Sequence, residues 1–340
     1  MIKGAIVGFG KIARTNHLQA FQSEELQKRI DITSAVEVDI NTRESCSKEY
    51  SRLNFYESLD EMYLSDKVDF IDITTPPKYH KEIIEWAIDK GIHIICEKPF
   101  TISYAEATEL YSKINDLNIL FVPCHQYKYS SLWGEFKSFI DELNDDEKVF
   151  LQFNVFRAGA DPGLNANVSP WRLNKDISGG GILSDTGFHY LYLATWLLGQ
   201  PNKVTAINHN LAHNNFQVED TSQVILEFER GIIQINLTWA SNSRKNEAKL
   251  ISKVGGLYYS GEEYLIKIIN GNEEIIAVPN VSDKSHYTSL YVNLFSDFAN
   301  NMQKKIFNKD GLKEALNTIY LLEKCYESSK AQKTIELINE

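Results

Sequence analysis

The chain has 340 residues, of which 43% are hydrophobic and 24% charged, and its formal net charge at pH 7 is −11. This length is generous for one domain and suits two domains with large cores. The negative charge argues against a nucleic-acid partner, because phosphates would be repelled. No apolar run approaches the roughly 18 residues of a membrane span, so we expect no membrane partner.

The spacing of the cysteines bears on metal binding, disulfide formation and the redox state of the protein's compartment. Cys46, Cys96, Cys124 and Cys325 are scattered without the paired spacing of a zinc site or a disulfide framework. The first residues also lack the long apolar region of a signal peptide. We therefore expect no metal and a reducing, cytoplasmic location.

The first 124 residues alternate strand-like and helix-like segments. The expected strands are KGAIVGFG (3–10), DITSAVEVD (31–39), VDFIDIT (68–74), IHIICE (92–97) and NILFVP (118–123). The expected helices are 11–22, 42–51, 79–90 and 103–115. Such alternation is typical of parallel strands joined by crossover helices, and it predicts a doubly wound α/β domain of the Rossmann type over residues 1–124.

After about residue 125 the pattern changes to strands with few helices between them. A helix at 130–143 precedes the strand KVFLQFNVFRAG (148–159), and an apolar helix follows the glycines at 179–181. Further strands are expected at 203–210, 221–229, 231–240, 246–254, 264–269 and 274–278, and closing helices at 287–306 and 310–332. Residues 125–340 therefore read as an α+β domain with a large, mostly antiparallel sheet, whose last helices can pack back on the first domain.

A glycine-rich turn links the first strand to the first helix. In GAIVGFGKIA, Gly8 permits a tight turn, Gly10 lets a pyrophosphate approach the backbone, and Ala13 lets helix and strand pack closely. The phosphates would lie on the backbone amides of the turn and the helix N-terminus. The residues expected to bind the dinucleotide here are Gly8, Phe9, Gly10, Lys11, Ile12 and Ala13. A purely structural turn is the alternative.

An acidic residue after the second strand indicates which dinucleotide is bound. Asp39 can accept hydrogen bonds from the adenosine ribose and would repel the 2′-phosphate of NADP. Glu37 has the same strand parity and is the alternative. The acidic residue favours NAD. Arg43 nearby can still accommodate a phosphate, so NADP stays as the less favoured alternative. Asp39 can also be an ordinary turn carboxylate.

Two polar residues interrupt the apolar helix of GGGILSDTGFHYLYLATWLLG (179–199). Asp185 and His189 are four residues apart, so they share one helix face. In one interpretation they form a polar pair in a cleft. In the other, Asp185 caps backbone amides and His189 is a satisfied interior histidine. Tyr127, Tyr129, Trp133 and Trp171 either stack on a sugar or belong to the core.

The segment CEKPF (96–100) makes the pattern familiar. Taken with VGFGKIA, TTPPKYH and SGGGILSDTGFH, the chain resembles the glucose–fructose oxidoreductase / inositol dehydrogenase (Gfo/Idh/MocA) family. The resemblance implies an N-terminal Rossmann domain and a C-terminal open-sheet domain with the substrate site and oligomer contacts. It also implies an NAD(P)-dependent dehydrogenase or reductase of sugars, cyclitols or related polyols, working as a homodimer or homotetramer.

The resemblance also implies roles for particular residues. Lys98 matches the active-site lysine and is expected to contact both the substrate and the cofactor. Glu97 before it is expected at the cofactor, and a cis bond between Lys98 and Pro99 is possible. The residues matching the loop beside the nicotinamide ribose are Thr75, Pro76 and His80. Trp171 and Arg172 match a pair that approaches the cofactor.

A second set of matches belongs to the C-terminal domain. Asp185 and His189 match the motif's aspartate and its acid/base histidine. HQYKYSS (125–131) resembles a divergent family segment, in which Gln126 is expected at the cofactor and Lys128 at the substrate. Lys128 stands where the family has arginine and Ser131 where it has proline, which puts the contacts of this segment in doubt.

Oxidising a secondary alcohol needs a hydride acceptor, a base for the hydroxyl proton and a group that stabilises the alkoxide. Imidazole titrates near neutral pH, so His189 can be the base. The ammonium of Lys98 can hold the substrate oxygen, and Asp185 can orient the ring or bind a neighbouring hydroxyl. The glycines at 179–181 would let the chain approach the nicotinamide. Two alternatives remain: glycoside cleavage through transient oxidation on bound NAD, and a non-catalytic dinucleotide sensor.

Overall fold

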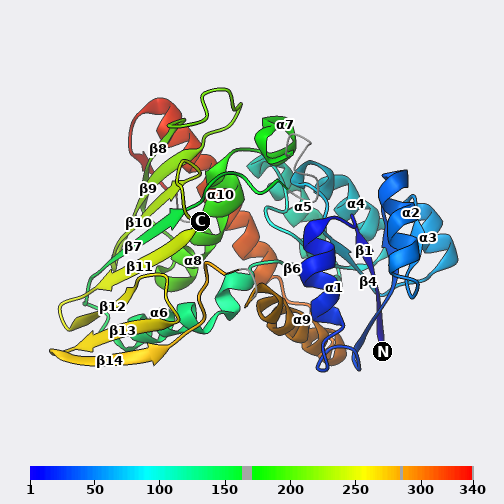
Figure 1. Ribbon diagram of the computed structural model, residues 1–340, viewed down its shortest axis with the longest axis horizontal. Helices are drawn as coiled ribbons and strands as arrows, with labels where there is room; N and C mark the ends of the chain where they lie inside the picture. The colour runs from blue at the N-terminus through cyan, green and yellow to red at the C-terminus, as the bar shows by residue number, and fades with distance from the viewer. Residues whose placement is uncertain (163–170, 284–285, 339–340) are drawn as a thin grey trace. The chain divides into compact units, whose positions relative to one another are not determined.

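The computed structural model describes residues 1–162, 171–283 and 286–338, and this part of the chain forms two compact units (Figure 1). The first unit comprises Met1–Gln126 together with Tyr287–Leu316. Most of the remaining described chain forms the second unit, which begins at Tyr127. A stretch near the C-terminus thus belongs with the N-terminal part of the chain.

The first unit contains a six-stranded parallel sheet in the order β3-β2-β1-β4-β5-β6. Its strands are β1 (Ile2–Val7), β2 (Ile30–Val36), β3 (Asn54–Tyr56), β4 (Phe70–Ile73), β5 (His93–Cys96) and β6 (Phe121–Pro123). Its helical elements up to β6 are η1 (Ala13–His17), α1 (Leu18–Phe21), α2 (Ile40–Glu49), α3 (Leu59–Ser65), η2 (Pro77–Tyr79), α4 (His80–Lys90) and α5 (Tyr104–Asn115). This confirms the predicted doubly wound α/β fold.

The strand order reverses beside β1, and ligands of such sheets bind at the carboxyl ends of the strands near this point. Val7, the last residue of β1, pairs with Val36 on one side and with Ile73 on the other. The segments that follow these strands therefore meet at one edge of the sheet. They carry the glycine turn, the acidic residues after β2 and the TTPP turn.

Two short elements of this unit were not predicted. The strand β3 has three residues and the helix α3 has seven. Segments this short carry too few periods of hydrophobic alternation to be recognised. The predicted helix at 11–22 exists but contains the π-helical turn η1 before the α-helical turn α1.

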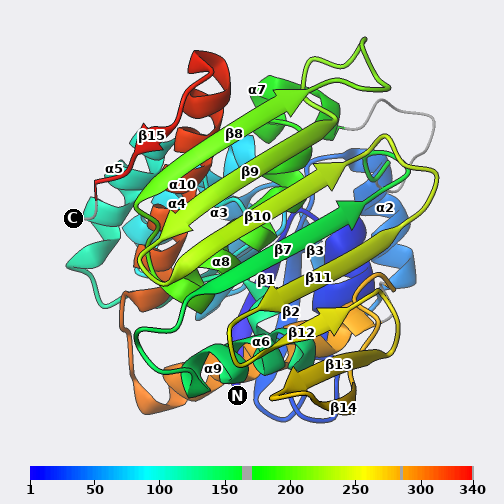
Figure 2. The ribbon, with the colours of Figure 1, turned by 90° about the vertical axis from the view of Figure 1, so that its left-hand side faces the viewer.

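The second unit is built on a nine-stranded sheet in the order β14-β13-β12-β11-β7-β10-β9-β8-β15 (Figure 2). Its strands are β7 (Val149–Phe156), β8 (Lys203–His209), β9 (Thr221–Phe228), β10 (Gly231–Thr238), β11 (Lys245–Ile251), β12 (Gly255–Tyr259), β13 (Tyr264–Ile269), β14 (Asn272–Ala277) and β15 (Ile335–Glu336). The pair of β7 and β10 is parallel and the others are antiparallel. The predicted large, mostly antiparallel sheet is confirmed.

The predicted strand at 246–254 is wrong at its last three residues, 252–254. β11 ends at Ile251, the chain turns with a hydrogen bond from the Ser252 N–H to the Gly255 carbonyl, and β12 returns beside it. A Cβ on Gly255 would lie 1.9 Å from the Ile268 carbonyl oxygen, so this glycine lets β12 pair closely with β13. The sequence VGG is a turn signal, but the predicted strand runs into this turn instead of ending before it.

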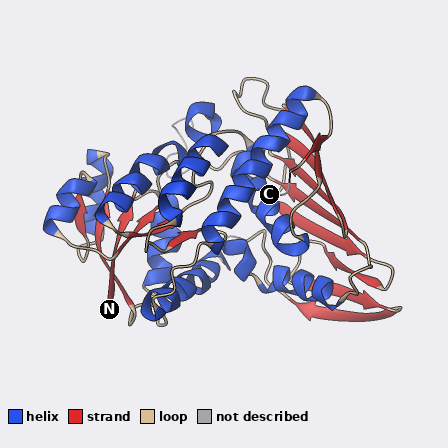
Figure 3. Ribbon diagram, turned by 180° about the vertical axis from the view of Figure 1, so that it is seen from behind, coloured by secondary structure: helices blue, strands red, loops and turns tan. Residues whose placement is uncertain are grey.

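Helices cover one face of this sheet (Figure 3). The helical elements of this region are η3 (Gln126–Tyr129), α6 (Ser131–Glu142), η4 (Trp171–Leu173), α7 (Lys175–Ser178), η5 (Leu183–Gly187) and α8 (Phe188–Leu198). Along β9, Val224 and Leu226 are buried whereas Gln223 and Ile225 are exposed, which is the alternation of a sheet with one covered face. The covered face contains the core.

Two long helices follow the sheet along the chain. α9 (Tyr287–Lys304) belongs to the first unit, where Phe295 stacks on Phe21 with ring centroids 4.2 Å apart. α10 (Asp310–Ala331) begins in the first unit and continues into the second. Among the described residues, the helices are too short or too polar to traverse a lipid bilayer.

Candidate active site

The glycine turn leaves room for a ligand where the motif predicts one. Gly8 has φ of +86°, and a Cβ there would lie 2.6 Å from Cγ2 of Thr75, so this turn packs tightly on the TTPP turn. A Cβ on Gly10 would meet no atom of the described chain within 4 Å. Ala13 is fully buried in η1. The tight packing at Gly8 is structural, whereas the space at Gly10 suits an approaching pyrophosphate.

The two acidic residues after β2, Asp39 and Glu37, have different hydrogen-bond partners. Asp39 caps α2, since its carboxylate accepts from the Thr42 N–H at 2.7 Å, and it is exposed. Glu37 instead lies against the glycine turn and accepts from the Phe9 N–H at 2.9 Å. The alternative, Glu37, is thus the acidic residue that contacts the glycine turn.

His80 is part of the interior of the first unit. Its side chain is fully buried, and its ring nitrogens lie 2.7 Å from the Thr75 carbonyl and 3.0 Å from the Pro99 carbonyl. Burial lowers the pKa of His80, whereas the two carbonyls act in the opposite direction and raise it. His80 thus ties the TTPP turn to the segment after Lys98, while Thr75 and Pro76 remain partly exposed.

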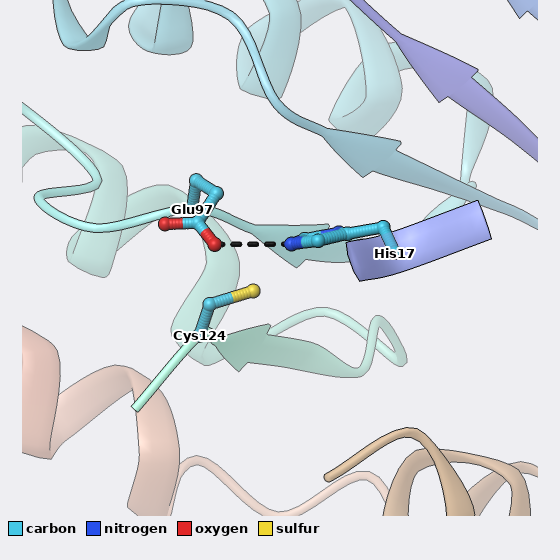
Figure 4. Close-up of side chains that lie close together, drawn as sticks. All are labelled: His17, Glu97 and Cys124. Carbon is cyan, nitrogen blue, oxygen red and sulfur yellow. Dashed lines mark hydrogen bonds and ion pairs between the residues drawn. The ribbon is translucent and has the colours of Figure 1, made fainter. Parts of the chain in front are cut away.

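Lys98 follows β5 and is partly exposed, and the Lys98–Pro99 peptide bond is cis, as the sequence allowed. Its backbone N–H donates to Oε2 of Glu97 at 3.1 Å. Oε1 of the same carboxylate accepts from the Tyr291 hydroxyl at 2.6 Å and lies 3.0 Å from Nε2 of His17 (Figure 4). Glu97 is thus held from two sides.

The other ring nitrogen of His17 lies 2.8 Å from Oδ2 of Asp72 in β4. Burial disfavours a charged ring, but the charges and hydrogen bonds of Asp72 and Glu97 outweigh it and raise the pKa of His17 to about 9. Burial favours a neutral Glu97, but the hydrogen bond to His17 and its charge outweigh this and lower the pKa of that carboxyl. His17 is therefore an imidazolium between two carboxylates.

Donor atoms of His17, Glu97 and Cys124 lie within 4.8 Å of one another, a grouping that can in principle hold a metal (Figure 4). Both His17 nitrogens are already hydrogen-bonded to carboxylates, and Oε1 of Glu97 also accepts from Tyr291. Burial raises the pKa of the Cys124 thiol, whereas a metal ligand must be a thiolate. We interpret the group as a hydrogen-bonded ion network.

Gln126 is also buried in this network, where its amide donates to the Tyr291 hydroxyl at 3.0 Å. Its Oε1 has no hydrogen-bond partner. The sequence placed this residue at the cofactor, and the structure shows how α9 fixes it. Lys128, two residues on in η3, is partly exposed.

In the second unit, the triglycine segment packs against two other segments of the chain. A Cβ on Gly180 would lie 1.9 Å from the Tyr326 hydroxyl, and one on Gly181 would lie 2.0 Å from the Glu219 carbonyl oxygen. The structure thus gives a reason for these glycines other than an approach to nicotinamide. They let the chain reach Glu219 and Tyr326.

Glu219 holds the start of the helix that carries Asp185 and His189. Its carboxylate accepts from the N–H groups of Gly181 at 3.0 Å and Leu183 at 3.1 Å, and from the Tyr326 hydroxyl at 2.8 Å. Its carbonyl accepts from the Ile182 N–H at 3.1 Å. These amides would otherwise lack partners at a helix N-terminus, so one partly buried residue fixes where the helix begins.

Asp185 lies in the π-helical turn η5 and pairs with Arg172, whose Nε donates to Oδ1 at 3.1 Å. The Arg172 guanidinium in turn lies 4.3 Å from the ring centroid of Trp171. The sequence assigned Asp185 to catalysis and the Trp171–Arg172 pair to the cofactor. The structure joins the three in one cluster.

His189 is 7% exposed, and neighbouring tyrosines fix its ring. Tyr127 stacks on it with centroids 4.2 Å apart, and Nδ1 lies 3.0 Å from the Tyr192 hydroxyl, which accepts from the Tyr127 N–H at 3.0 Å. Tyr127 thus supports the histidine from the core, and Trp133 is also buried. The residue that contacts the ring edge is Tyr192, which sequence reasoning missed although it lies three residues along the same helix.

Comparisons with known proteins agree with this architecture. Residues 2–123 match the model of an oxidoreductase family with an NAD-binding Rossmann fold, and residues 150–257 match the model of the Gfo/Idh/MocA C-terminal domain. A solved levoglucosan dehydrogenase in complex with NADH has a TM-score of 0.86 at 17% identity over 100% of both chains, which shows a shared fold.

Curated relatives match over part of their length. An uncharacterized oxidoreductase of Schizosaccharomyces pombe is 26% identical over 253 residues, 71% of this chain and 64% of that protein. A levoglucosan dehydrogenase of Pseudarthrobacter phenanthrenivorans is 31% identical over 141 residues, 41% of this chain and 35% of that protein. The matched region is thus less than two thirds of either relative.

The space at Gly10 leads to a prediction. Gly10→Ala should leave the melting temperature unchanged, because a methyl group fits the free protein, but should weaken NADH binding about tenfold or more by blocking the pyrophosphate. Fluorescence titration with NADH and thermal unfolding would measure both effects. Gly134→Ala in α6, where a Cβ also meets no neighbour within 4 Å, is the matched control and should leave NADH binding intact. Equal NADH affinity in both variants would contradict the assignment.

Proposed function

The chain belongs to the Gfo/Idh/MocA oxidoreductase family, and on that basis we propose that it is an NAD-dependent dehydrogenase of a sugar, cyclitol or sugar derivative. The observation that carries the proposal is the held imidazole of His189, between the Tyr127 ring and the Tyr192 hydroxyl. The proposed partner is a small polyol or sugar. The relatives named levoglucosan dehydrogenase support a sugar as substrate.

The proposed chemistry assigns proton transfer to His189. A base needs an unprotonated nitrogen, so the active tautomer carries its proton on Nδ1, donates it to the Tyr192 hydroxyl and keeps the Nε2 lone pair. Lys98 supplies an ammonium that stabilises the developing alkoxide. NAD, when bound, supplies the hydride acceptor. Asp185, paired with Arg172, is proposed to orient a neighbouring substrate hydroxyl.

The proposed cofactor site uses the glycine turn and the segments beside it. Backbone groups of the turn would meet the pyrophosphate, and Glu37 rather than Asp39 would accept from the adenosine ribose, which favours NAD over NADP. His80, Glu97 and Gln126 are proposed to act by fixing neighbouring segments, because all three are buried. Thr75, Pro76, Trp171 and Arg172 are partly exposed and remain candidates for direct contact, and Lys128 for substrate contact.

Changing the proposed catalytic residues should separate chemistry from cofactor binding. In Lys98→Met and His189→Ala, kcat for NADH formation should fall by about 10²–10⁴, because alkoxide stabilisation or proton transfer is lost. A panel of inositols, aldoses, amino sugars and nucleotide sugars would supply the substrate. NADH affinity should stay within a few-fold, as measured by fluorescence titration.

The matched control is Lys81→Met. It removes a lysine on α4 that pairs with Glu109 on α5, and it should keep full activity. Turnover retained in the folded Lys98 or His189 variant would refute the assigned roles. Release of a leaving group without net NADH would favour glycoside cleavage instead. NADH binding without turnover of any sugar would favour a sensor.

The assignment of Glu37 leads to a second prediction. Glu37→Ser should shift the ratio of kcat/KM for NAD to that for NADP about tenfold or more toward NADP, because a repelling carboxylate is lost. Asp39→Ser is the matched control: serine can also cap α2, and cofactor preference should not change. A shift in the Asp39 variant alone would restore the original prediction.

We further propose that the protein forms a homodimer or homotetramer through the uncovered face of the nine-stranded sheet. The side chains on this face include Phe150, Ile207, Ile225 and Ile232, which are 39%, 60%, 36% and 42% exposed. Phe150 and Ile232 are paired residues of β7 and β10, and the next residues of that face, Gln152 and Gln234, bond to each other. An apolar centre with few charges is typical of an interface.

The four cysteines are free and buried, in keeping with the expected cytoplasmic location.

A charge on this face should therefore lower the oligomeric state. Ile232→Lys should move the protein from oligomer to monomer in sedimentation velocity, because a lysine at the interface centre would be desolvated without a partner. Leu64→Lys, which changes an equally apolar residue 82% exposed on α3, is the control and should change nothing. A wild-type protein that is monomeric at micromolar concentration would contradict the proposal.

A further inference from the structure

A buried chain of polar groups connects the first helix, the sheet and α9 to the segment that carries Lys98. Asp72 in β4, His17 in η1 and Glu97 after β5 are in contact in that order, and Tyr291 in α9 reaches the same carboxylate. Figure 4 shows the contact between His17 and Glu97. The side chains of His17 and Asp72 are fully buried, and that of Glu97 is 11% exposed. Burying three ionisable groups costs desolvation free energy, so their presence here indicates a role beyond packing.

The two oxygens of Glu97 have separate partners. Oε1 is anchored by His17 and Tyr291, and Oε2 accepts from the Lys98 N–H. The anchored side therefore determines where the other side can hold the lysine backbone. If Glu97 became a neutral acid, one oxygen would carry a proton and this arrangement of acceptors would be lost.

We propose that His17 is a positioning residue for Lys98: as an imidazolium bridging Asp72 and Glu97, it keeps the Glu97 carboxylate ionised and oriented to hold the Lys98 backbone. The proposal rests on the proposed catalytic role of Lys98. His17 acts through Glu97 and is not itself a catalytic residue.

The charge of His17, and not only its shape, carries the argument. Without it, the carboxyls of Asp72 and Glu97 would face a buried site with no cation between them, which favours the uptake of a proton by one of them. Burial raises the pKa of Asp72 even with the imidazolium beside it. The titratable groups around His17 in the described part of the chain include Asp72 in β4, His80 in α4, Cys96 in β5, Glu97 and Lys98 after it, Cys124 after β6 and Tyr291 in α9.

The test compares the pH dependence of kcat in variants of this network. In His17→Gln, kcat should fall about tenfold or more near pH 6 and recover toward wild type near pH 9, as Glu97 regains its charge. NADH affinity should be unchanged. Tyr291→Phe is the matched control, because it removes one hydrogen bond to the same oxygen but no charge, and it should lower kcat by a small factor independent of pH.

A second substitution should rescue the first. In the double variant His17→Gln/Asp72→Asn, Glu97 is the one carboxylate left of the pair and ionises at lower pH, so kcat near neutral pH should partly return. A kcat ratio of His17→Gln to wild type that is constant with pH, together with no rescue, would overturn the proposal and leave a structural histidine.

If His17→Gln does not fold, the double variant His17→Gln/Asp72→Asn carries the test alone. With no second buried carboxylate beside it, Glu97 keeps its charge, so kcat of this variant should stay within a few-fold of wild type between about pH 6 and pH 9. A loss of about tenfold or more at neutral pH would overturn the proposal.

Two further measurements separate the possible failures. Loss of activity in Lys98→Met with none in His17→Gln would refute the positioning role and leave the proposed function standing. Retained activity in Lys98→Met would refute the function assigned to the lysine itself. Dialysis of the wild type against EDTA should leave kcat unchanged, and a loss restored by zinc would overturn the proposal in favour of a metal site.

Discussion

A carboxylate that is removed from water needs hydrogen-bond donors or a cation beside it. The contacts that two such carboxylates make fix the two segments that carry the proposed catalytic side chains. Glu97 is met by His17, Tyr291 and the Lys98 backbone. Glu219 is met by the amides at the start of the helix of His189 and by Tyr326. In each unit, a buried acid outside the proposed reaction determines the backbone position of a residue proposed to take part in it.

The two acids are satisfied by different means. Glu97 has a cation beside it, and its pKa is lowered despite burial. Burial raises the pKa of Glu219, and backbone and tyrosine donors lower it only in part. An ion network responds to pH through the charge of its cation, whereas a carboxylate bound mainly by backbone amides responds through its own protonation. The folded-state pKa values of both His17 and Glu219 are raised, so both groups favour the folded state more as the pH falls, and the stability that the His17 cation gives is lost as the pH rises through about 9.

Each of the two units also contains a π-helical turn. η1 places His17 between Asp72 and Glu97, and η5 contains Asp185 at the point where Arg172 reaches it. Turns of this kind are rare within α-helices and frequent at functional sites, because the extra residue widens the turn and redirects the side chains on it. Close packing accompanies them: a Cβ on Gly187 at the end of η5 would lie 2.6 Å from Leu237 on β10. Glycine is needed there so that the helix can lie directly on the sheet.

The sequence by itself determined the α/β fold of the first unit, the mostly antiparallel sheet of the second, the dinucleotide turn and the candidate residues Lys98, Asp185 and His189. These follow from local periodicity and from motifs whose residues are close in the chain. The tertiary structure alone decided which partners those residues have. His17 and Glu97 are 80 positions apart, and Glu97 and Tyr291 are 194 apart. No local pattern links side chains at such separations, because burial and chain crossing bring them together. For the same reason the fold, and not the spacing of the motif, placed Glu37 against the glycine turn and gave Gly180 and Gly181 their structural role.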